Sequence, residues 1–118
     1  MILCGIDSLK IERMEKSLKI QRFVQSVFSE YEQEYIKTKS NSYETAAGLW
    51  CAKEAFLKAY GTGIESLQLS EISVCHDERG EPHIKLSGDA IKKYHFQNVS
   101  LSITHTDDTA TAIVIIEK

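Results

Sequence analysis

The sequence lacks the features that would place it among membrane, secreted or nucleic-acid-binding proteins. Its longest uncharged apolar run is far shorter than the roughly 20 residues that a membrane-spanning helix needs. The stretch MILCGIDSLK has no basic leader before its apolar residues, so no signal peptide is expected. The formal net charge of −3 argues against non-specific binding to nucleic acid. We therefore expect a cytoplasmic protein that binds neither membrane nor nucleic acid.

Internal repeats, low-complexity tracts and linkers are also lacking, so the 118 residues are expected to form one small domain, 1–118. The three cysteines, Cys4, Cys51 and Cys75, are an odd number without metal-ligand spacing. We expect them to be buried free thiols in a reducing compartment.

The first half of the chain predicts mainly helices. MILCGID suits a short buried strand, and a helix is expected over 8–25 with Ile11, Met14 and Leu18 facing inward. A second helix begins at a capping box made by Ser29 and Glu32, and the polar stretch TKSNS ends it. A third helix is expected to begin near Ser42 and to end at Gly61 or Gly63, because glycine adopts the left-handed conformation that terminates helices.

The second half predicts mainly strands. EISVCHD and PHIKLS flank ERGE and predict a β-hairpin with a glycine turn, followed by a short helix over SGDAIKKYH. VSLSITH and TATAIVIIE predict two further strands joined around Asp107 and Asp108. The last strand is apolar on both faces, which indicates a central strand or a contact between subunits. The expected fold is α+β, with an antiparallel sheet packed against helices.

The apolar stretch 46–60 carries only three charged residues, Lys53, Glu54 and Lys58. Helical geometry puts Glu54 and Lys58 on a narrow boundary between a face of large side chains and a face of small ones. A surface pair at this spacing contributes only about 0.2–0.5 kcal/mol and is common. Burial favours a functional role instead, because a buried charge is costly unless it is paired or binds a metal. The glycines of the following Gly-Thr-Gly would let backbone N–H groups approach an anion.

Two other stretches carry residues that suit the same chemistry. Asp7 in GIDSLKIER is either the N-cap of the next helix or an oxygen ligand for Mg²⁺, which binds few protein carboxylates together with phosphates and water. His105 in SITHTDD, flanked by Thr104 and Thr106, is either a turn histidine or a group that contacts phosphate or transfers a proton.

Charge is distributed unevenly along the chain. Residues 8–22 hold five basic and two acidic residues, a net charge of +3, which leaves −6 for the remainder. The stretch is either a solvated helix face or a docking surface for an acidic partner.

Taken in order, GIDSLKIER, WCAKEAFLKAYGTG and SLSITHTDDTATAIVI resemble the holo-acyl-carrier-protein synthase family, the short single-domain bacterial type of 4′-phosphopantetheinyl transferase. The resemblance also covers FSEYEQEY and DERGEPHIKLSG, and therefore nearly the whole chain. It implies an enzyme of fatty acid biosynthesis that uses Mg²⁺ to transfer the phosphopantetheine of coenzyme A to a serine of apo acyl carrier protein. Adenosine 3′,5′-bisphosphate would be released.

The resemblance also implies residue roles. Asp7 and Glu54 would bind the metal, and Glu54 or a metal-bound water would take the serine proton. Arg13, Arg22 and Phe23 would contact the acidic carrier protein. Glu54, Lys58 and His105 would be the catalytic residues. Coenzyme A would be bound by Lys58, Gly61, Thr62, Gly63, Thr104, His105 and Thr106.

One position departs from the family pattern. The family usually has Arg where this chain has Leu49, so an Arg that could bind phosphate is missing. Lys53, four residues further along the helix, is expected to supply part of that phosphate binding. The family forms homotrimers with active sites between subunits, and a last strand that is apolar on both faces is compatible with that assembly.

Two alternatives to this function are a transferase for a polyketide or peptide synthetase carrier and a non-catalytic module that binds coenzyme A. Synthetase-type relatives are about twice as long, as two fused copies, which argues against the first. The presence of Asp7, Glu54 and Lys58 argues against the second.

Overall fold

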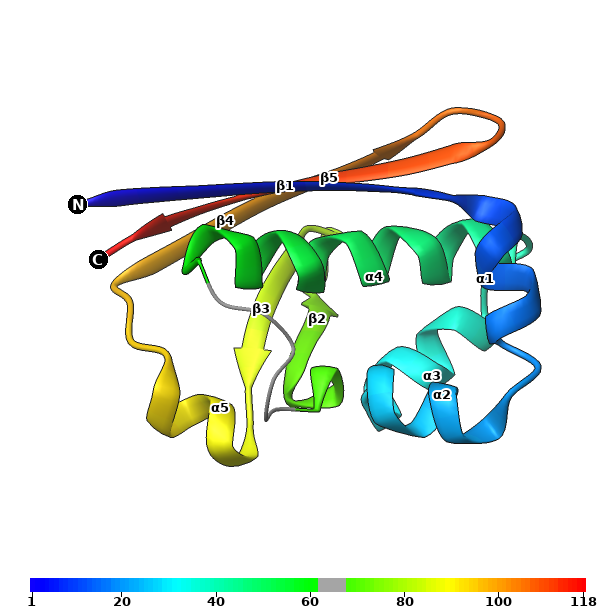
Figure 1. Ribbon diagram of the computed structural model, residues 1–118, viewed down its shortest axis with the longest axis horizontal. Coiled ribbons are helices and arrows are strands. Elements are labelled where there is room, and N and C mark those ends of the chain that lie inside the picture. The colour runs from blue at the N-terminus through cyan, green and yellow to red at the C-terminus, as the bar shows by residue number, and fades with distance from the viewer. Residues whose placement is uncertain (62–67) are drawn as a thin grey trace.

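A three-stranded antiparallel sheet and one long helix form the centre of the structure, a computed structural model that describes residues 1–61 and 68–118 (Figure 1). The strands are β1 (Ile2–Lys10), β2 (Ile72–His76), β3 (Pro82–Leu86), β4 (Asn98–His105) and β5 (Thr109–Glu117). The helices are α1 (Ile11–Ser17), α2 (Gln21–Val27), α3 (Glu30–Lys37), α4 (Ser42–Ala59) and α5 (Gly88–Lys93), with a 3₁₀ turn η1 over Leu69–Glu71.

The sheet has the order β1-β5-β4, and β2 and β3 form a separate two-stranded sheet. All the helices that the structure describes lie on one side of the three-stranded sheet, with α4 directly against it (Figure 1). The β2–β3 hairpin packs against this same side, beside α4. The expected α+β architecture with an antiparallel sheet is confirmed.

The first strand differs from its prediction in length and burial. β1 has nine residues and lies at an edge of the sheet, paired with β5 from Ile2↔Glu117 to Lys10↔Thr109. Ile2 and Ile6 are 63% and 58% exposed, so the prediction of a short buried strand is wrong. Of the two alternatives for the last strand, a central position or a contact between subunits, the central position is confirmed, because β5 pairs with β1 on one side and β4 on the other.

The helix expected over 8–25 is two shorter helices. Pairing with β5 keeps residues 8–10 in β1, so α1 begins only at Ile11. The chain then turns after Leu18, and Ile20 is extended with φ −102° and ψ 107°. Met14 is buried as expected, while Ile11 and Leu18 are partly buried against the core. The turn allows α2 to pack against η1 and to stack Phe23 on Trp50 of α4, and the following Phe28 is fully buried.

The ends of the other helices were predicted correctly from the residues next to them. The Ser29 hydroxyl accepts a hydrogen bond from the Glu32 backbone N–H, and the Glu32 side chain accepts one from the Ser29 N–H, so the predicted capping box is present. α4 begins at Ser42 and is followed by Gly61, which has φ +71° and donates its N–H to the Lys58 carbonyl. Glycine adopts this conformation without the steric cost that other residues meet.

The small-residue face of α4 allows the helix to approach the sheet closely. A Cβ atom on Gly5 of β1 would lie 1.9 Å from the Ala55 carbonyl oxygen. On the opposite face, Phe56 packs against the rings of Tyr60 and Tyr94, with centroids 5.2 Å away in each case. The helix is therefore packed on two sides, as its sequence predicted.

The hairpin, the last helix and β4 agree with their predictions, whereas two of the three cysteines do not. The β2–β3 hairpin turns at Gly80, which has φ +85°, and α5 and β4 occupy their predicted segments. The cysteines are free, but Cys51 alone is fully buried, since Cys4 is exposed and Cys75 is intermediate. No helix among the described residues has the length and apolar character needed to cross a membrane.

Candidate active site

Asp7, Glu54 and Lys58 gather where β1 crosses the C-terminal half of α4. Asp7 pairs across the sheet with the buried Ala112, and paired residues point to the same face, so the carboxylate points toward α4. Lys58 Nζ lies 2.8 Å from Asp7 Oδ1 and donates to the Ile6 carbonyl at 3.1 Å. The N-cap position of α1 is Lys10, so Asp7 does not cap that helix.

The charges of this cluster act on one another. Burial raises the pKa of Glu54, and the nearby Asp7 raises it further while Lys58 partly opposes the rise. The hydrogen bond and charge of Asp7 raise the pKa of Lys58. Burial, with contributions from Asp7 and Glu54, raises the pKa of Cys51 to about 12, so this thiol stays neutral. The local environment therefore favours an additional cation.

The donor set fits a magnesium ion that keeps other ligands. The described residues contain no group of three or more His, Cys, Asp or Glu side chains that could hold a metal by themselves. Two nearby carboxylates suit Mg²⁺, because this ion usually binds one or two protein carboxylates and takes its other ligands from phosphates and water.

A cavity of about 440 Å³ opens beside the two carboxylates. Asp7 and Glu54 form part of its wall together with Arg13 and Phe23, two of the residues expected to meet the carrier protein. The third, Arg22, is exposed on α2 and does not line the cavity. Sequence reasoning missed Trp50, which lines the same cavity and stacks on Phe23 with a centroid distance of 5.7 Å. The available signal was an aromatic residue three positions before Lys53, the first residue of the charged triplet.

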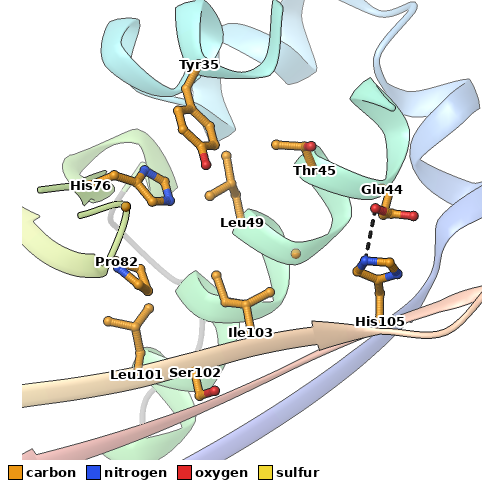
Figure 2. A pocket seen from close by; sticks show the side chains of 12 residues that line it. Tyr35, Glu44, Thr45, Leu49, His76, Pro82, Leu101, Ser102, Ile103 and His105 are labelled. Atoms are coloured by element: carbon orange, nitrogen blue, oxygen red, sulfur yellow. Dashed lines mark ion pairs between the residues drawn. The ribbon is translucent and has the colours of Figure 1, made fainter. Parts of the chain in front are cut away.

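His105 lies in a different part of the chain. His105 is the last residue of β4, and β5 lies between β4 and β1 in the sheet. Its Nε2 lies 3.0 Å from Glu44 Oε1 (Figure 2). Its Nδ1 lies 3.2 Å from the Thr106 carbonyl. Within one chain, therefore, His105 and Lys58 belong to separate places on the surface. Sequence reasoning did not identify Glu44 as the partner of His105, since the two are far apart in the sequence.

The flanking threonines point elsewhere. Thr104 is exposed and pairs across the sheet with Thr111. The Thr106 hydroxyl donates to Asp108 Oδ1 at 3.1 Å and accepts from the Thr109 N–H, which stabilises the β4–β5 turn. Of the predicted glycine loop, only Gly61 is described; Thr62 and Gly63 lie outside the described residues.

Lys53 cannot bind phosphate as the sequence suggested. Its side chain is fully buried in an ion pair with the equally buried Glu32. Its Nζ also donates to the Ile72 carbonyl at 2.8 Å and to the Leu69 carbonyl at 3.0 Å. An ammonium group has three hydrogens, and these three partners use all of them. The prediction that Lys53 replaces a phosphate-binding Arg is therefore wrong.

Comparisons with known proteins agree on one family. Residues 3–114 match the 4′-phosphopantetheinyl transferase superfamily. The chain is 37% identical over 119 residues to a holo-[acyl-carrier-protein] synthase of Halothermothrix orenii, a match that covers 97% of this chain and 95% of the relative.

Solved structures give the same result. The fold is similar to a Bacillus anthracis holo-(acyl-carrier-protein) synthase in complex with CoA (3′,5′-ADP), with 34% identity, a TM-score of 0.81 and coverage of 98% and 96%. It is also similar to the Helicobacter pylori enzyme in complex with coenzyme A, with 30% identity, a TM-score of 0.86 and coverage of 98% and 100%.

Proposed function

The chain belongs to the 4′-phosphopantetheinyl transferase superfamily, and on that premise we propose that it is a holo-acyl-carrier-protein synthase. As one domain over 1–118, it transfers 4′-phosphopantetheine from coenzyme A to a serine of apo acyl carrier protein. This reaction serves fatty acid biosynthesis in the cytoplasm. The observation that carries the proposal is the cluster of Asp7, Glu54 and Lys58 beside a cavity that Arg13 and Phe23 also line.

The chemistry is a phosphoryl transfer. The serine oxygen forms a bond to the phosphorus that carries the pantetheine arm, the bond from that phosphorus to the bridging oxygen breaks, and adenosine 3′,5′-bisphosphate leaves. Such transfers depend mainly on positioning and on charge neutralisation. Asp7 and Glu54 would hold Mg²⁺, which would supply positive charge to offset that of the pyrophosphate. Lys58 would add a positive charge beside it, and Glu54, whose pKa burial raises, would accept the serine proton.

The cavity beside the carboxylates is the proposed entrance for the carrier serine. Arg13 contributes a positive charge to its wall, and the stacked pair of Phe23 and Trp50 contributes an apolar surface. The net charge of +3 on residues 8–22, which include Arg22, would attract an acidic carrier. Electrostatic attraction brings the partner to the site, and the apolar surface supports its docking.

We further propose a homotrimer with active sites between subunits. The outer face of the three-stranded sheet carries Ile2, Ile6 and Ile115, which are 63%, 58% and 42% exposed, and no helix of the described residues lies on that side (Figure 1). Covering this apolar face with other copies would stabilise the assembly. It would also offer a route for His105 of one copy to approach Lys58 of another, which one chain keeps apart.

The test is to mix the purified protein with Mg²⁺, coenzyme A and apo acyl carrier protein, and to weigh the carrier by mass spectrometry. A mass increase of one phosphopantetheine group supports the proposal. No increase, with coenzyme A bound, would favour the non-catalytic module. An increase only on a peptide or polyketide synthetase carrier would favour the other transferase.

The metal assignment has its own test. Asp7→Asn and Glu54→Gln should each abolish most of the transfer while circular dichroism shows unchanged helix content. Asp89→Asn on the exposed surface of α5 serves as the control and should transfer normally. Activity within a few-fold of wild type for either site variant would contradict the metal assignment.

A further inference from the structure

Lys53 connects α4 to the elements on the side of the helix that faces away from the three-stranded sheet. Its Nζ lies 2.5 Å from Glu32 Oε1 of α3, and it donates to the carbonyls of Leu69 in η1 and Ile72 in β2 at 3.0 and 2.8 Å. Figure 1 shows α4 between the sheet on one side and α3 and β2 on the other. One fully buried side chain therefore ties the helix that carries Glu54 to three separate parts of the fold.

The carboxylate that pairs with Lys53 is itself held in place. Glu32 Oε1 accepts the Ser29 N–H at 2.9 Å within the capping box of α3, and Glu32 Oε2 accepts the Val74 N–H of β2 at 2.7 Å. Replacing a buried ion pair by apolar residues of similar volume is often neutral for stability. The contacts of Lys53 are therefore better explained by the arrangement they impose than by the free energy they add.

The position of Glu54 depends on how α4 is rotated about its own axis. Glu54 follows Lys53 directly and points about 100° further around the helix. The other carboxylate, Asp7, is held by Lys58 at 2.8 Å, but among the described residues Glu54 has no hydrogen-bond or ion-pair partner. The distance between the two carboxylates is therefore set by the orientation of the helix.

The side of α4 that faces the sheet offers little resistance to rotation. Its residues are small (Gly48, Ala52, Ala55 and Ala59), so it approaches the strands closely but has no long side chains that interlock with them. A carboxylate about 6 Å from the helix axis moves about 1 Å when the helix rotates by about 10°. A displacement of about 1 Å can lower a reaction rate about a hundredfold. Contacts on the opposite side, where Lys53 lies, must therefore fix the rotation.

Apolar side chains also pack on that opposite side, but the hydrophobic effect is non-directional, whereas the hydrogen bonds of Lys53 have preferred lengths and angles. We propose that Lys53 is a positioning residue: by tying α4 to α3, η1 and β2, it holds Glu54 at the separation from Asp7 that a shared divalent cation requires. In this role Lys53 touches neither the metal nor a substrate. The inference rests on the proposed function, in which Asp7 and Glu54 bind Mg²⁺.

The experiment measures the affinity of the full chain for Mn²⁺, a paramagnetic substitute for Mg²⁺, by electron paramagnetic resonance with coenzyme A present. It compares wild type, Lys53→Met, Lys53→Met combined with Glu32→Gln, and Ile36→Ala. The double variant leaves no unpaired charge, so it carries the test if Lys53→Met alone does not fold. Ile36→Ala is the matched control: Ile36 is buried on α3, its truncation destabilises the fold, and its apolar side chain makes no hydrogen bond to α4.

Replacement of a residue that orients a metal ligand typically lowers metal affinity or activity about 10- to 100-fold. Lys53→Met and the double variant should therefore bind Mn²⁺ about tenfold more weakly and lose at least about tenfold in kcat, with KM for the carrier within about twofold of wild type. The double variant should show this loss even though it is more stable than Lys53→Met. Ile36→Ala should bind Mn²⁺ within about twofold of wild type despite a lower urea midpoint.

Two results would overturn the inference: Mn²⁺ affinity within about twofold of wild type in folded Lys53→Met or in the double variant, or an equal loss in Ile36→Ala, since reduced stability would then explain the effect. The wild-type protein separates this question from the proposed function. If wild type modifies the carrier while the Lys53 variants bind Mn²⁺ normally, the function stands and only the role of Lys53 is rejected. If wild type binds no Mn²⁺ and modifies no carrier, the proposed function itself fails and Lys53 has no metal site to position.

Discussion

Replacing Lys53 by Met should destabilise the protein strongly without removing any contact with substrate. The ion pair with Glu32 is fully buried on both sides. Removal of one partner from a buried pair costs about 3–5 kcal/mol, because the other charge is left uncompensated. In this variant the Glu32 carboxylate still accepts hydrogen bonds from the N–H groups of Ser29 and Val74, at 2.9 and 2.7 Å. The carbonyl groups of Leu69 and Ile72, which accept hydrogen bonds from Lys53, lose their donor.

The loss is large compared with the total stability of a small domain, which is about 5–15 kcal/mol. With a urea dependence of about 2 kcal/mol per molar, a loss of about 4 kcal/mol lowers the unfolding midpoint by about 2 M. Trp50, the single tryptophan, provides the fluorescence signal. Protein concentration must be held constant, because assembly would make stability depend on it.

A double variant separates the charge effect from the loss of packing. Lys53→Met combined with Glu32→Gln leaves no unpaired charge and should be more stable than Lys53→Met alone by at least about 1 kcal/mol. Lys37→Met, at an exposed ion pair, should change stability by less than about 1 kcal/mol. The reasoning is refuted if Lys53→Met costs less than about 1 kcal/mol but weakens coenzyme A tenfold, since Lys53 would then be a ligand-binding residue.

Three further predictions concern other parts of the molecule. Gly5→Ala should lower the urea midpoint or prevent folding, because the new Cβ would lie 1.9 Å from the Ala55 carbonyl oxygen; an unchanged midpoint would mean that β1 and α4 can move apart freely. Arg13→Glu should raise KM for the carrier and leave KM for coenzyme A nearly unchanged, with a smaller effect at 1 M salt, where the screening length is about 3 Å; equal loss toward both substrates would indicate a folding role. Burial lowers the pKa of His76 below its ordinary value of 6.5. Below pH 6.5 the unfolded chain therefore binds a proton at this histidine that the folded protein does not bind. The stability of the folded protein should then fall as the pH drops from 6.5 to the pKa of His76 in the folded protein. His76→Phe should reduce that slope in urea titrations, and an unchanged slope would assign it to other groups.

Features that depend on neighbouring residues were predictable from the sequence. The capping box at Ser29 and Glu32, the helix stop at Gly61 and the hairpin turn at Gly80 each need only a few adjacent positions. The alternation of β4 likewise revealed its buried and exposed faces. Asp7, Glu54 and Lys58 could be grouped because their residue types suit one chemistry, although only the fold places them together.

Features that depend on distant partners were missed. Residues 8–10 resembled the start of a helix, but they are held in β1 by pairing with β5. The partner of Lys10 in that pairing is Thr109, about 100 residues further along the chain. Glu32 appeared fully explained by its capping role, yet its other oxygen accepts from Val74 N–H and its carboxylate also pairs with Lys53. Because the capping role already accounts for Glu32 in the sequence, nothing in the sequence indicates its second role as the buried partner of Lys53.

The pairing of β1 with β5 has a consequence for biosynthesis. Among the described elements, β1 leaves the ribosome first and its partner strand β5 leaves last, and the backbone groups of Met1 and Lys118 bond to each other. Until β5 has emerged, β1 therefore exposes unpaired backbone groups together with Ile2 and Ile6. The β4–β5 hairpin can form locally, but the three-stranded sheet closes only after β5 has emerged. Nascent chains that stall before β5 is complete would retain an open strand edge, the structure through which polypeptides associate with one another.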